Sequence, residues 1–478
     1  MELGPVVAVV AVVIGILAGE RAGAAGASTA LVVGAAALGA AWFTHPPARS
    51  MITALACALL AFASIGRAMH GQSSSALTAA IDQRAPATLH GVATGDPSGP
   101  AYATDLLVRV DTGRGSHRTL LARASGDDGV ALRVVEAGDR VVLRGRLAPL
   151  GPGAADDRAR WRHAVGRLDE AEIVGLSAPR GLVGIADSIR AVIVRGTRPL
   201  DPVPRALVAG FLLGDTRGVP PQVIDDFRDS GLSHLLAVSG ENVAFVLALA
   251  APLLRRMRLG ARTVLALAIV LVFAAMTRFE PSVLRASAMA AIALLATLSG
   301  RPASGVRVLA YAVVILLLAD PFLLHSVAFV LSCGASAGIA CLSQPIAARL
   351  RGPRFVREPL AVSIAAQIGV IPVLLCVFGT FPLITPATNL VAAPAAEALG
   401  VYGFFASAVA GVVPALGPLA QQPTALLVGW ITTIAHLGAA VPFAIDGRGA
   451  VGLVAVAAAG ASVACLRARR AVSDTPAR

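Results

Sequence analysis

GFLLGDTRGVPPQVIDDFRDSGLSHLLAVSGEN, residues 210–242, is the stretch around which the rest of the chain is organised. It begins apolar, becomes charged and amphipathic, and then enters a second apolar run that carries His234, Ser239, Glu241 and Asn242. Lipid offers polar side chains no hydrogen-bond partner, so polar groups at the mouth of a membrane helix require a protein-lined or wet surrounding. The stretch therefore predicts a functional element at a membrane boundary.

The composition is that of a polytopic membrane protein. Of the 478 residues, 56% are hydrophobic and 14% are charged, whereas soluble domains carry about 25% charged residues. Apolar runs of about 15 to 25 residues recur along the chain, and runs of this length are needed to cross a bilayer.

All 40 basic residues are arginine. Without lysine the chain has neither a Walker A lysine nor a Schiff-base lysine, which excludes the usual ATP-hydrolysing P-loop and imine catalysis. Energy for any transport must therefore come from another chain or from a gradient. The five cysteines all lie in apolar runs, so we expect small core thiols and neither a disulfide framework nor metal ligands.

Twelve apolar segments are predicted to span the membrane, and the first three are expected to form an N-terminal bundle. In the tenth segment Pro386 and Pro394 interrupt the apolar run, so it is either one span or a broken, re-entrant helix. The segments are Val6–Ala18, Ser28–Phe43, Met51–Ile65, Leu232–Leu254, Thr263–Thr277, Ser282–Leu298, Val308–Ala319, Leu323–Leu342, Leu360–Phe378, Leu383–Val412, Ala425–Val441 and Val451–Leu466.

Arginine clusters set the predicted orientation. With these spans, all four clusters fall on one side, which is the cytoplasmic side by the positive-inside rule. Both termini are then cytoplasmic, and the hydrophilic region lies outside the membrane. The clusters are Arg255 to Arg262, Arg301 with Arg307, Arg349 to Arg357, and Arg467 to Arg470.

Residues 67–180 form the one sizeable hydrophilic region, and their pattern is typical of strands. Residues 102–110 alternate between apolar and polar, the period-2 pattern of a half-buried strand. Further strand candidates are Ala87–Thr94, Asp139–Leu147 and Glu170–Leu176. Short strands at this spacing over about 90 residues are typical of a small five-stranded barrel such as an OB-fold.

The positive charge of this predicted barrel is local. Between positions 140 and 167 there are seven arginines and two aspartates, a net charge of +5. A surface that binds single strands usually adds several aromatic rings for stacking on bases, and aromatic residues are scarce here. Two interpretations stay open: a barrel that contacts DNA, or a solvated barrel that braces the helices. The candidates for DNA contact are Arg140, Arg144, Arg146, Trp161 and Tyr102.

Residues 181–230 are predicted to form short helices that do not cross the membrane. Leu182–Val194 is amphipathic, with Asp187 and Arg190 on its polar side, and we expect it to lie along the membrane surface. Two short segments follow it, Arg205–Leu213 and Pro220–Asp229.

His234 and Glu241 lie seven residues apart in the predicted span Leu232–Leu254, which places them within about 20° of each other on a helix. A charged side chain at mid-bilayer costs roughly 2.5–3.5 kcal/mol or more unless it faces protein or water. We therefore expect this face to line a wet or packed interior, unless Glu241 lies high enough to reach bulk water.

Arg285 opens a later span and follows Glu280 and Pro281. It is either a structural partner of Glu280 or a phosphate ligand, because its planar guanidinium matches phosphate oxygens. Further polar groups within apolar runs are Gln367, Asn389, Glu397 and His436.

Several of these motifs together carry a family resemblance. They are Leu213-Gly214-Asp215, Phe227-Arg228, Gly231, the run from His234 to Gly240, Pro281 to Ala286, Ala319-Asp320-Pro321, Phe329 to Ser332, Ala366-Gln367, Pro372, Phe378-Gly379, and Asn389-Leu390 with Pro394. The chain resembles the ComEC family of inner-membrane proteins, which take single-stranded DNA into bacteria during natural transformation. The resemblance implies an OB-like domain in the hydrophilic region and a DNA path through the helices.

The sequence also departs from that family. Glu241-Asn242 follows Ser-Gly where Leu-His is common, and Val330 stands where Gln is common. Many members end in a metallo-β-lactamase-like domain, whose chemistry needs a tight His-x-His-x-Asp-His cluster for two metals. Here each of the eight histidines is at least 20 residues from the next, so we expect no nuclease site, no metal and no cofactor.

The sequence therefore predicts an all-α polytopic membrane protein of about twelve transmembrane helices with an inserted small extracytoplasmic β-barrel that is OB-like. Predicted segments are 1–66 (membrane helices), 67–180 (barrel), 181–230 (amphipathic or re-entrant helices), 231–467 (channel) and 468–478 (cytoplasmic tail). We expect a channel for single-stranded DNA and not an enzyme, in the bacterial cytoplasmic membrane, working with a separate DNA receptor, motor ATPase and nuclease. A small-solute transporter using Asn389 and Glu397, or a hydrolase using Ser239 and His234, is the alternative.

The residues expected along the DNA path or at its gate come from both the opening stretch and the later spans. They are Asp215, Arg217, His234, Ser239, Glu241, Asn242, Arg285, Gln367 and Asn389.

Overall fold

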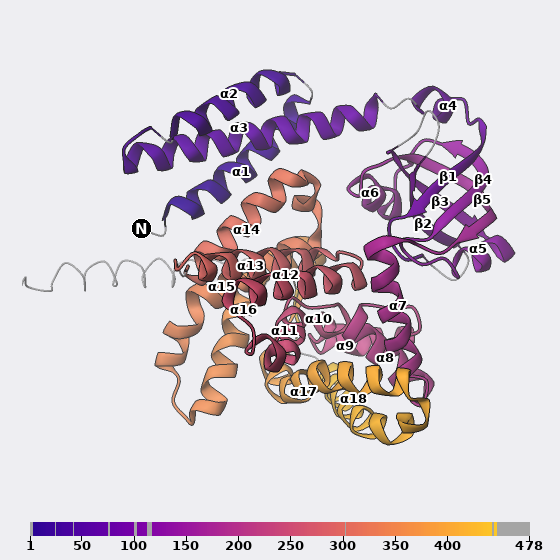
Figure 1. Cartoon of the computed structure of the whole chain (residues 1–478), viewed down its shortest axis with the longest axis vertical. Helices are drawn as coiled ribbons and strands as arrows, with labels where there is room; N and C mark the ends of the chain where they lie inside the picture. Colours follow the sequence, from indigo (N-terminus) through magenta and orange to yellow (C-terminus); the bar gives the residue numbers. More distant parts are fainter. Residues whose placement is uncertain are drawn as a thin grey trace, which may run out of the picture. The chain divides into compact units, whose positions relative to one another are not determined.

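The computed structural model describes residues 3–23, 25–41, 43–74, 77–99, 103–111, 117–301, 303–441 and 444–446. Tyr102, the predicted span Val451–Leu466 and the predicted tail lie outside these residues. The chain folds as two compact units (Figure 1). Unit 1 comprises Met1–Arg198, Val238–Phe329 and Ser407–Gly417, and unit 2 comprises Pro199–Ala237, Val330–Ala406 and Pro418–Arg478.

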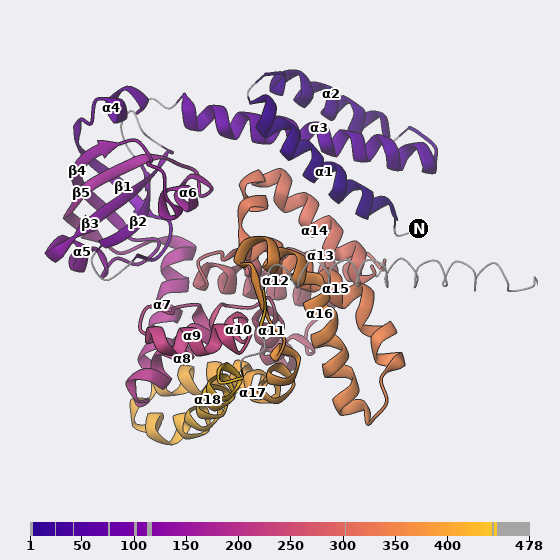
Figure 2. The ribbon, with the colours of Figure 1, turned by 180° about the vertical axis from the view of Figure 1, so that it is seen from behind.

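Unit 1 begins with the predicted three-helix bundle, in which α1 and α2 both pack on α3 (Figures 1 and 2). A Cβ on Gly15 of α1 would lie 2.2 Å from the Ala58 carbonyl oxygen of α3, so only glycine allows this approach. Small residues at such crossings let membrane helices pack closely. The helices are α1 (Leu3–Ala22), α2 (Ala27–Ala41) and α3 (Pro46–Ser73).

The hydrophilic region of unit 1 forms a closed five-stranded barrel with the strand order β1-β2-β3-β5-β4. Neighbouring strands are antiparallel except β3 and β5, which are parallel. The small barrel expected from the sequence is therefore present. Its elements are α4 (Thr78–Asp82), β1 (Pro86–Ala93), β2 (Ala103–Val110), β3 (Thr119–Ser125), α5 (Gly126–Leu132), β4 (Arg140–Ala148), α6 (Ala154–Arg160) and β5 (Ala164–Ser177).

Alternation of apolar and polar residues predicts those barrel strands whose outer face is exposed to water. On β2, Leu106, Val108 and Val110 are buried in the barrel core, as their period-2 spacing requires. Strand β3 has no such alternation, because its outward-facing Leu121 is also buried, against Ala159 of α6. Because α6 covers its outer face, β3 lacks the alternation from which a strand is predicted.

The remaining helices of the described residues divide between the two units. Those mainly in unit 1 are α7 (Gly181–Gly196), α11 (Glu241–Leu254), α12 (Leu259–Met276), α13 (Pro281–Leu298), α14 (Gly305–Ala319), η1 (Pro321–His325) and η2 (Pro414–Leu416). Those mainly in unit 2 are α8 (Pro202–Leu213), α9 (Pro221–Asp229), α10 (Ser233–Leu236), α15 (Val327–Arg349), α16 (Arg354–Phe378), α17 (Thr385–Val412) and α18 (Gly417–Ala439), with short strands β6 (Thr380–Pro382) and β7 (Ala444–Asp446).

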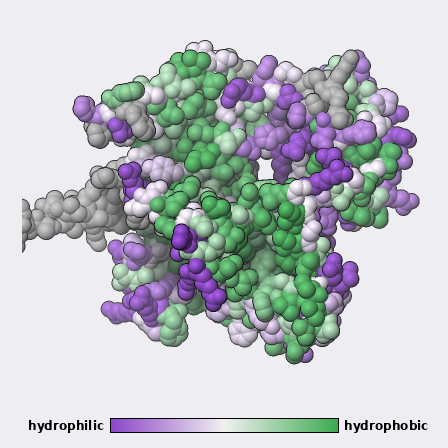
Figure 3. Space-filling model, in the orientation of Figure 1, coloured by the Kyte–Doolittle hydropathy of each residue, from purple (hydrophilic) through white to green (hydrophobic). Residues whose placement is uncertain are grey.

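Seven helices in the described part of the chain are long and apolar enough to cross a membrane. These are α1, α3, α12, α13, α15, α16 and α17, while α2, α8, α11 and α14 are shorter apolar helices. Hydrophobic side chains cover much of the helical surface, and hydrophilic ones gather over the barrel (Figure 3). The protein is therefore a membrane protein with several apolar helices and a small mixed sheet.

Two predicted spans have other helix boundaries in the structure, and the two alternatives left open for the proline-containing segment are decided. The predicted span Ala425–Val441 falls mostly in α18, which is not among the seven described helices long and apolar enough to cross a membrane. Leu232–Leu254 is not one helix, because α10 ends at Leu236, Ala237 is extended, and α11 begins only at Glu241. Leu323–Leu342 starts in the 3₁₀ turn η1, and its long helix begins at Val327. The segment with two prolines forms the single helix α17, in which Pro386 lies in the first turn and Pro394 is internal.

The helix α7 is amphipathic as predicted, but its polar side is buried in protein. Arg190 of α7 is only 2% exposed, and its guanidinium binds the Asp96 carboxylate at 3.1 Å and the Met276 carbonyl oxygen at 3.1 Å. Apolar side chains including Ile185 and Ile189 are exposed instead. The predicted polar side is therefore present, but it packs on other parts of unit 1.

A second buried arginine completes this cluster. Arg278, in the link between α12 and α13, binds Asp96 of the β1–β2 link at 3.2 Å, Glu136 at 3.3 Å, and Asp187 of α7. Its side chain is 8% exposed. We call Asp96, Asp187, Arg190 and Arg278 the ion cluster. It joins the barrel, α7 and the α12–α13 link within unit 1.

Replacing Arg278 by methionine should strongly destabilise unit 1. The change keeps an unbranched apolar stem but removes the guanidinium, which leaves the Asp187 carboxylate without this cation, and breaking a buried pair costs about 3–5 kcal/mol. The measurement is the denaturant midpoint of the purified protein in detergent. Arg354→Met is the control, because it breaks an exposed pair with Glu358 on α16, worth about 0–1 kcal/mol. Equal midpoints for the two variants would contradict this role of the ion cluster.

Candidate functional site

The predicted path residues divide between the two units. Those in unit 1 are Ser239, Glu241, Asn242 and Arg285, and those in unit 2 are Asp215, Arg217, His234, Gln367 and Asn389. His234 and Glu241 do not share a helix, because the chain leaves the helical conformation between Leu236 and Glu241. The prediction that these two side chains occupy one helix face is therefore wrong. Ser239 and Gly240 lie in the interruption, between the two apolar runs that were predicted to form one span.

In unit 1 the turn at Val238–Asn242 packs against the first turn of α13. Ser282 donates a hydrogen bond from Oγ to the Val238 carbonyl oxygen at 2.7 Å. A Cβ on Gly240 would lie 2.3 Å from Nη2 of Arg285 and 2.9 Å from Cβ of Ala286. Glycine at position 240 thus lets the backbone of the turn contact the Arg285 guanidinium directly.

The charged and amide groups of this turn occupy different surroundings. Glu241 is exposed in the first turn of α11, where the positive end of the helix dipole favours a carboxylate. Asn242 is buried at 6% exposure and lies within 3.5 Å of Ser239 Oγ through its Oδ1 atom. The structure therefore brings Ser239, Asn242 and Arg285 to one small region, with Glu241 at its exposed edge.

Arg285 is 8% exposed, and its Nη1 lies 3.0 Å from the sulfur of Met289 one turn along α13. Glu280, the alternative partner predicted for Arg285, lies just before α13. Burial raises the pKa of Glu280, the nearby Arg162 guanidinium lowers it, and the Asp96 carboxylate raises it. The charged neighbours of Glu280 thus include groups of the barrel. A guanidinium in contact with a turn can bind an arriving anion, because its five donors are directional and it is always charged.

In unit 2 the opening stretch folds into three short helices, and α10 packs on α8 and α9. Gly214 ends α8 in the left-handed conformation at φ +75°. Asp215 and Arg217 then form a two-pronged ion pair, with nitrogen–oxygen distances of 2.8 and 2.7 Å. His234 is exposed on α10. The ion pair between Asp215 and Arg217 therefore stabilises the turn after α8.

Gly231 fixes the opening stretch to α17 within unit 2. Its φ is +77°, and a Cβ there would lie 1.9 Å from Oγ1 of Thr385. Thr388, one turn later on α17, donates a hydrogen bond to the Ser230 carbonyl oxygen at 2.8 Å. Glycine is required at position 231 both by the backbone conformation and by this contact. Thr385 and Thr388 of α17 were not among the predicted site residues. The one signal for them in the sequence is that they are polar residues close to Asn389.

The α16–α17 pair places two of the predicted amides near each other. Asn389 of α17 donates from Nδ2 to Ser363 Oγ at 3.4 Å. Gln367 lies four residues after Ser363, on the same face of α16. Its side chain is 7% exposed, and among the described residues its Nε2 atom has no hydrogen-bond partner. This polar strip in apolar helices is chemically suited to a water molecule or a passing polar group.

The barrel residues that were predicted to contact DNA lie in two different surroundings. Arg140, Arg144 and Arg146 are exposed on β4, and the Arg144 guanidinium is 3.9 Å from Glu172. Trp161 instead stacks on His325 of η1, with ring centroids 3.8 Å apart and planes 12° apart. One face of its ring is therefore covered by the protein and is not available to a base.

Comparison with protein families gives one match, and two known proteins are similar in sequence. A family model described as "Competence protein" matches residues 211–471, more than half of the chain. ComE operon protein 3 of Bacillus subtilis (strain 168) is 26% identical over 298 residues, which cover 59% of this chain and 37% of that protein. The uncharacterized protein YcaI of Escherichia coli (strain K12) is 31% identical over 150 residues, covering 29% of this chain and 20% of that protein. No solved structure matches.

Gly240→Ala should destabilise the turn against α13. The new Cβ would collide with Ala286 as well as with the Arg285 guanidinium, and overpacking of this kind costs about 1–3 kcal/mol. Gly260→Ala is the matched control, because a Cβ at that exposed position of α12 meets no atom within 4 Å. The denaturant midpoint in detergent should fall for the first variant and stay unchanged for the second. An unchanged midpoint for Gly240→Ala would show that the turn does not pack tightly on α13.

Proposed function

The chain belongs to the competence protein family, and from that premise we propose that it passes single-stranded DNA inward across the bacterial cytoplasmic membrane during natural transformation. The match over residues 211–471 carries this proposal. Similarity to ComE operon protein 3 supports it, although the matched region is 37% of that protein. Several apolar helices fit a conduit in the membrane.

The proposed conduit recognises the backbone of the strand and not its bases. Phosphates recur at a regular spacing whatever the sequence, so cations along a path suffice for sequence-independent passage. Arg285 is the proposed phosphate ligand, because it is buried at the Gly240 turn and its planar guanidinium suits phosphate oxygens. Glu241 repels phosphate and acts as a gate or as a partner for arginine.

The other predicted residues are proposed to line the path or to shape its gate. Ser239 and Asn242 belong to the same turn as Glu241, and Gln367 and Asn389 offer neutral amides to a hydrated strand. Neutral amides can form hydrogen bonds with phosphate oxygens without holding them as strongly as arginine. Asp215, Arg217 and His234 lie in the short helices and turns of the opening stretch, where a change of conformation would open or close the entrance.

The barrel is proposed to be OB-like and to lie outside the membrane. Its strand order and the parallel pairing of β3 with β5 support a small Greek-key barrel. The arginine clusters put both termini in the cytoplasm under the positive-inside rule. The proposed domain boundaries divide the chain into segments 1–66, 67–180, 181–230, 231–467 and 468–478. A DNA receptor, a motor ATPase and a nuclease are the proposed partners, since the chain has no lysine for a P-loop.

The two alternative functions draw less support from the geometry. A transporter site at Asn389 and Glu397 would need both side chains at one place, yet Glu397 is exposed on α17 while Asn389 binds Ser363. A hydrolase using Ser239 and His234 would need a nucleophile and a base within hydrogen-bond reach. Ser239 instead lies against Asn242 in the turn before α11.

Deleting the gene should abolish the recovery of transformants with free DNA, and the wild-type gene should restore it. In the complemented strain, Arg285→Ala should reduce transformants strongly, because the phosphate ligand is lost. Arg285→Lys should recover only part of the activity, because lysine keeps the charge and loses the planar fork. Membrane abundance is measured beside each transformation frequency.

Two outcomes would count against this account. Undiminished transformation in the deletion strain would contradict the proposed function. Normal transformation by Arg285→Ala at normal abundance would remove its phosphate role and leave Arg285 as a structural residue of α13.

Single-cysteine labelling tests the proposed orientation. In a background without the five native cysteines, Ser125→Cys on the barrel should react with a membrane-impermeant maleimide in intact spheroplasts. Arg258→Cys and Arg354→Cys, which lie in arginine clusters, should react only after lysis. The reverse pattern would place the barrel in the cytoplasm.

A further inference from the structure

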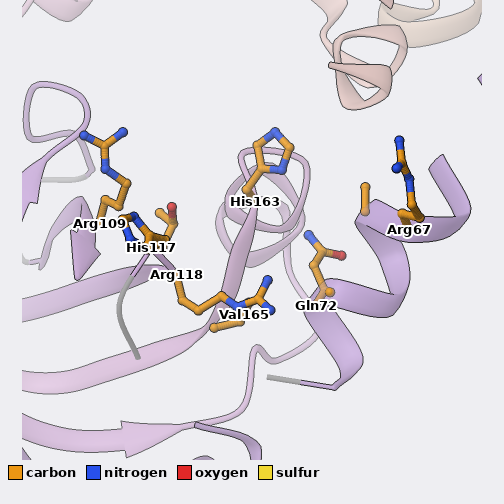
Figure 4. A pocket seen from close by; sticks show the side chains of 10 residues that line it. Arg67, Gln72, Arg109, His117, Arg118, His163 and Val165 are labelled. Carbon is orange, nitrogen blue, oxygen red and sulfur yellow. The ribbon is translucent and has the colours of Figure 1, made fainter. Parts of the chain in front are cut away.

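A cleft lies between α3 and the barrel, within unit 1 (Figure 4). Its volume is about 320 Å³. Arg67 lines it from α3, Arg109 from β2, His117 and Arg118 from the end of the β2–β3 link, and His163 from the residue before β5. These residues are far apart in sequence, so no local motif indicates the cleft. We refer to it as the α3–barrel cleft.

The cleft is strongly cationic. Three arginines and two histidines line it, and none of the lining residues that the structure describes is acidic. Arg67 and Arg109 are exposed, and in the described part of the chain neither has an ion-pair partner. Among the same residues, the carboxylate paired with a lining residue is that of Asp320, whose Oδ1 is 3.1 Å from Nε2 of His163. The lining therefore attracts an anion.

The walls of the cleft are held in place by contacts between α3 and the barrel. The Arg118 guanidinium lies against Gly71 of α3, where a Cβ would approach its Nη1 to 3.0 Å. Gln72 of α3 donates from Nε2 to the Arg160 carbonyl oxygen at 2.7 Å. The stacking of Trp161 on His325 adds a third contact, between the barrel and η1. The arginines are thus presented by two walls that are already joined.

The length of α3 allows its end at the cleft to lie beyond the hydrocarbon core. The helix has 28 residues, which at about 1.5 Å per residue span about 42 Å, against a core about 30 Å thick and about 40–45 Å with the headgroup layers. With the start of α3 at one edge of the core, the stretch from Arg67 to Ser73 reaches the opposite headgroup layer and the water beside it. Both a soluble phosphodiester and a lipid headgroup offer phosphate there, so the test includes both.

The chemistry of the lining selects among soluble anions. Guanidinium groups from two sides can contact successive phosphates of one strand. Within the described ranges, the aromatic groups that line the cleft are the two imidazoles, so we expect recognition to rest mainly on phosphates and not on stacked bases. The second and third strands, which border the cleft, form the usual oligonucleotide face of OB-type barrels.

We propose that the α3–barrel cleft binds the phosphodiester backbone of single-stranded DNA where the strand passes from the barrel to the membrane helices. This inference rests on the proposed function and adds a binding site that none of the path residues above includes. Arg67 and Arg109 contact phosphates from opposite walls, while Arg118 contributes charge from its position against Gly71.

The test measures binding of a fluorescein-labelled 20-nucleotide oligothymidylate to the full-length protein in phosphatidylcholine nanodiscs over a series of salt concentrations. Each lost phosphate contact should lower the magnitude of the slope of log K against log salt by about 0.7 for a single strand. The double variant Arg67→Ala/Arg109→Ala should therefore lower it by about 1.4, and Arg67→Lys/Arg109→Lys should keep most of it. Arg158→Ala is the control, since this exposed arginine of α6 does not line the cleft.

Each outcome decides one point. An unchanged slope in the double alanine variant would overturn the cleft site, and normal complementation by the wild-type gene would still support the proposed function. If short-chain phosphatidylglycerol binds the wild type but not the double variant, while DNA binds both equally, the cleft is a lipid site and the inference fails. Failure of the wild-type gene to restore transformation in the deletion strain would instead refute the proposed function.

Discussion

The ion cluster is the interaction on which the arrangement of unit 1 depends. Arg190 and Arg278 are buried cations, and Asp96 and Asp187 neutralise them from the barrel and from α7. Uncompensated burial of such charges would cost several kcal/mol per ion, so the carboxylates and cations must meet for the fold to form. Arg278 and Phe279 both have positive φ angles, +59° and +53°. Backbone strain of this kind persists where surrounding contacts fix the conformation, and the ion cluster supplies such contacts.

The same cluster connects the barrel to the proposed path. The link that carries Arg278 leads directly into α13, whose first turn holds Ser282 and Arg285 against the Val238–Gly240 turn. In a second set of contacts, Trp161 and His163 contact η1, and Arg118 contacts α3. The barrel is thus attached to the helices of unit 1 at two places. This double attachment holds the walls of the α3–barrel cleft together, so the cleft does not depend on a flexible tether.

Features set by local periodicity could be predicted from the sequence, and features set by distant contacts could not. The N-terminal bundle, strands β1, β2 and β4, and the family motifs follow from apolar runs, alternation and local signatures. The interruption before Glu241 was not predicted, because apolar runs on both sides of it were joined into one span, although Ser239, Gly240, Glu241 and Asn242 break the apolar pattern there. The polar side of α7 was recognised, but its partner Arg278 lies 91 residues from Asp187. The α3–barrel cleft could not be predicted either, because the residues that line it are far apart in the sequence.

A distance measurement between spin labels tests most directly the claim that the ion cluster fixes the barrel on the helices. One label replaces Asp128 on α5, and the other replaces Arg258 at the start of α12; both positions are exposed and belong to unit 1. Double electron–electron resonance in nanodiscs should give one narrow distance distribution. The distribution should broaden when Arg278 is also replaced by methionine. A distribution that is already broad with Arg278 in place would contradict the account, since the barrel would then move independently of the helices.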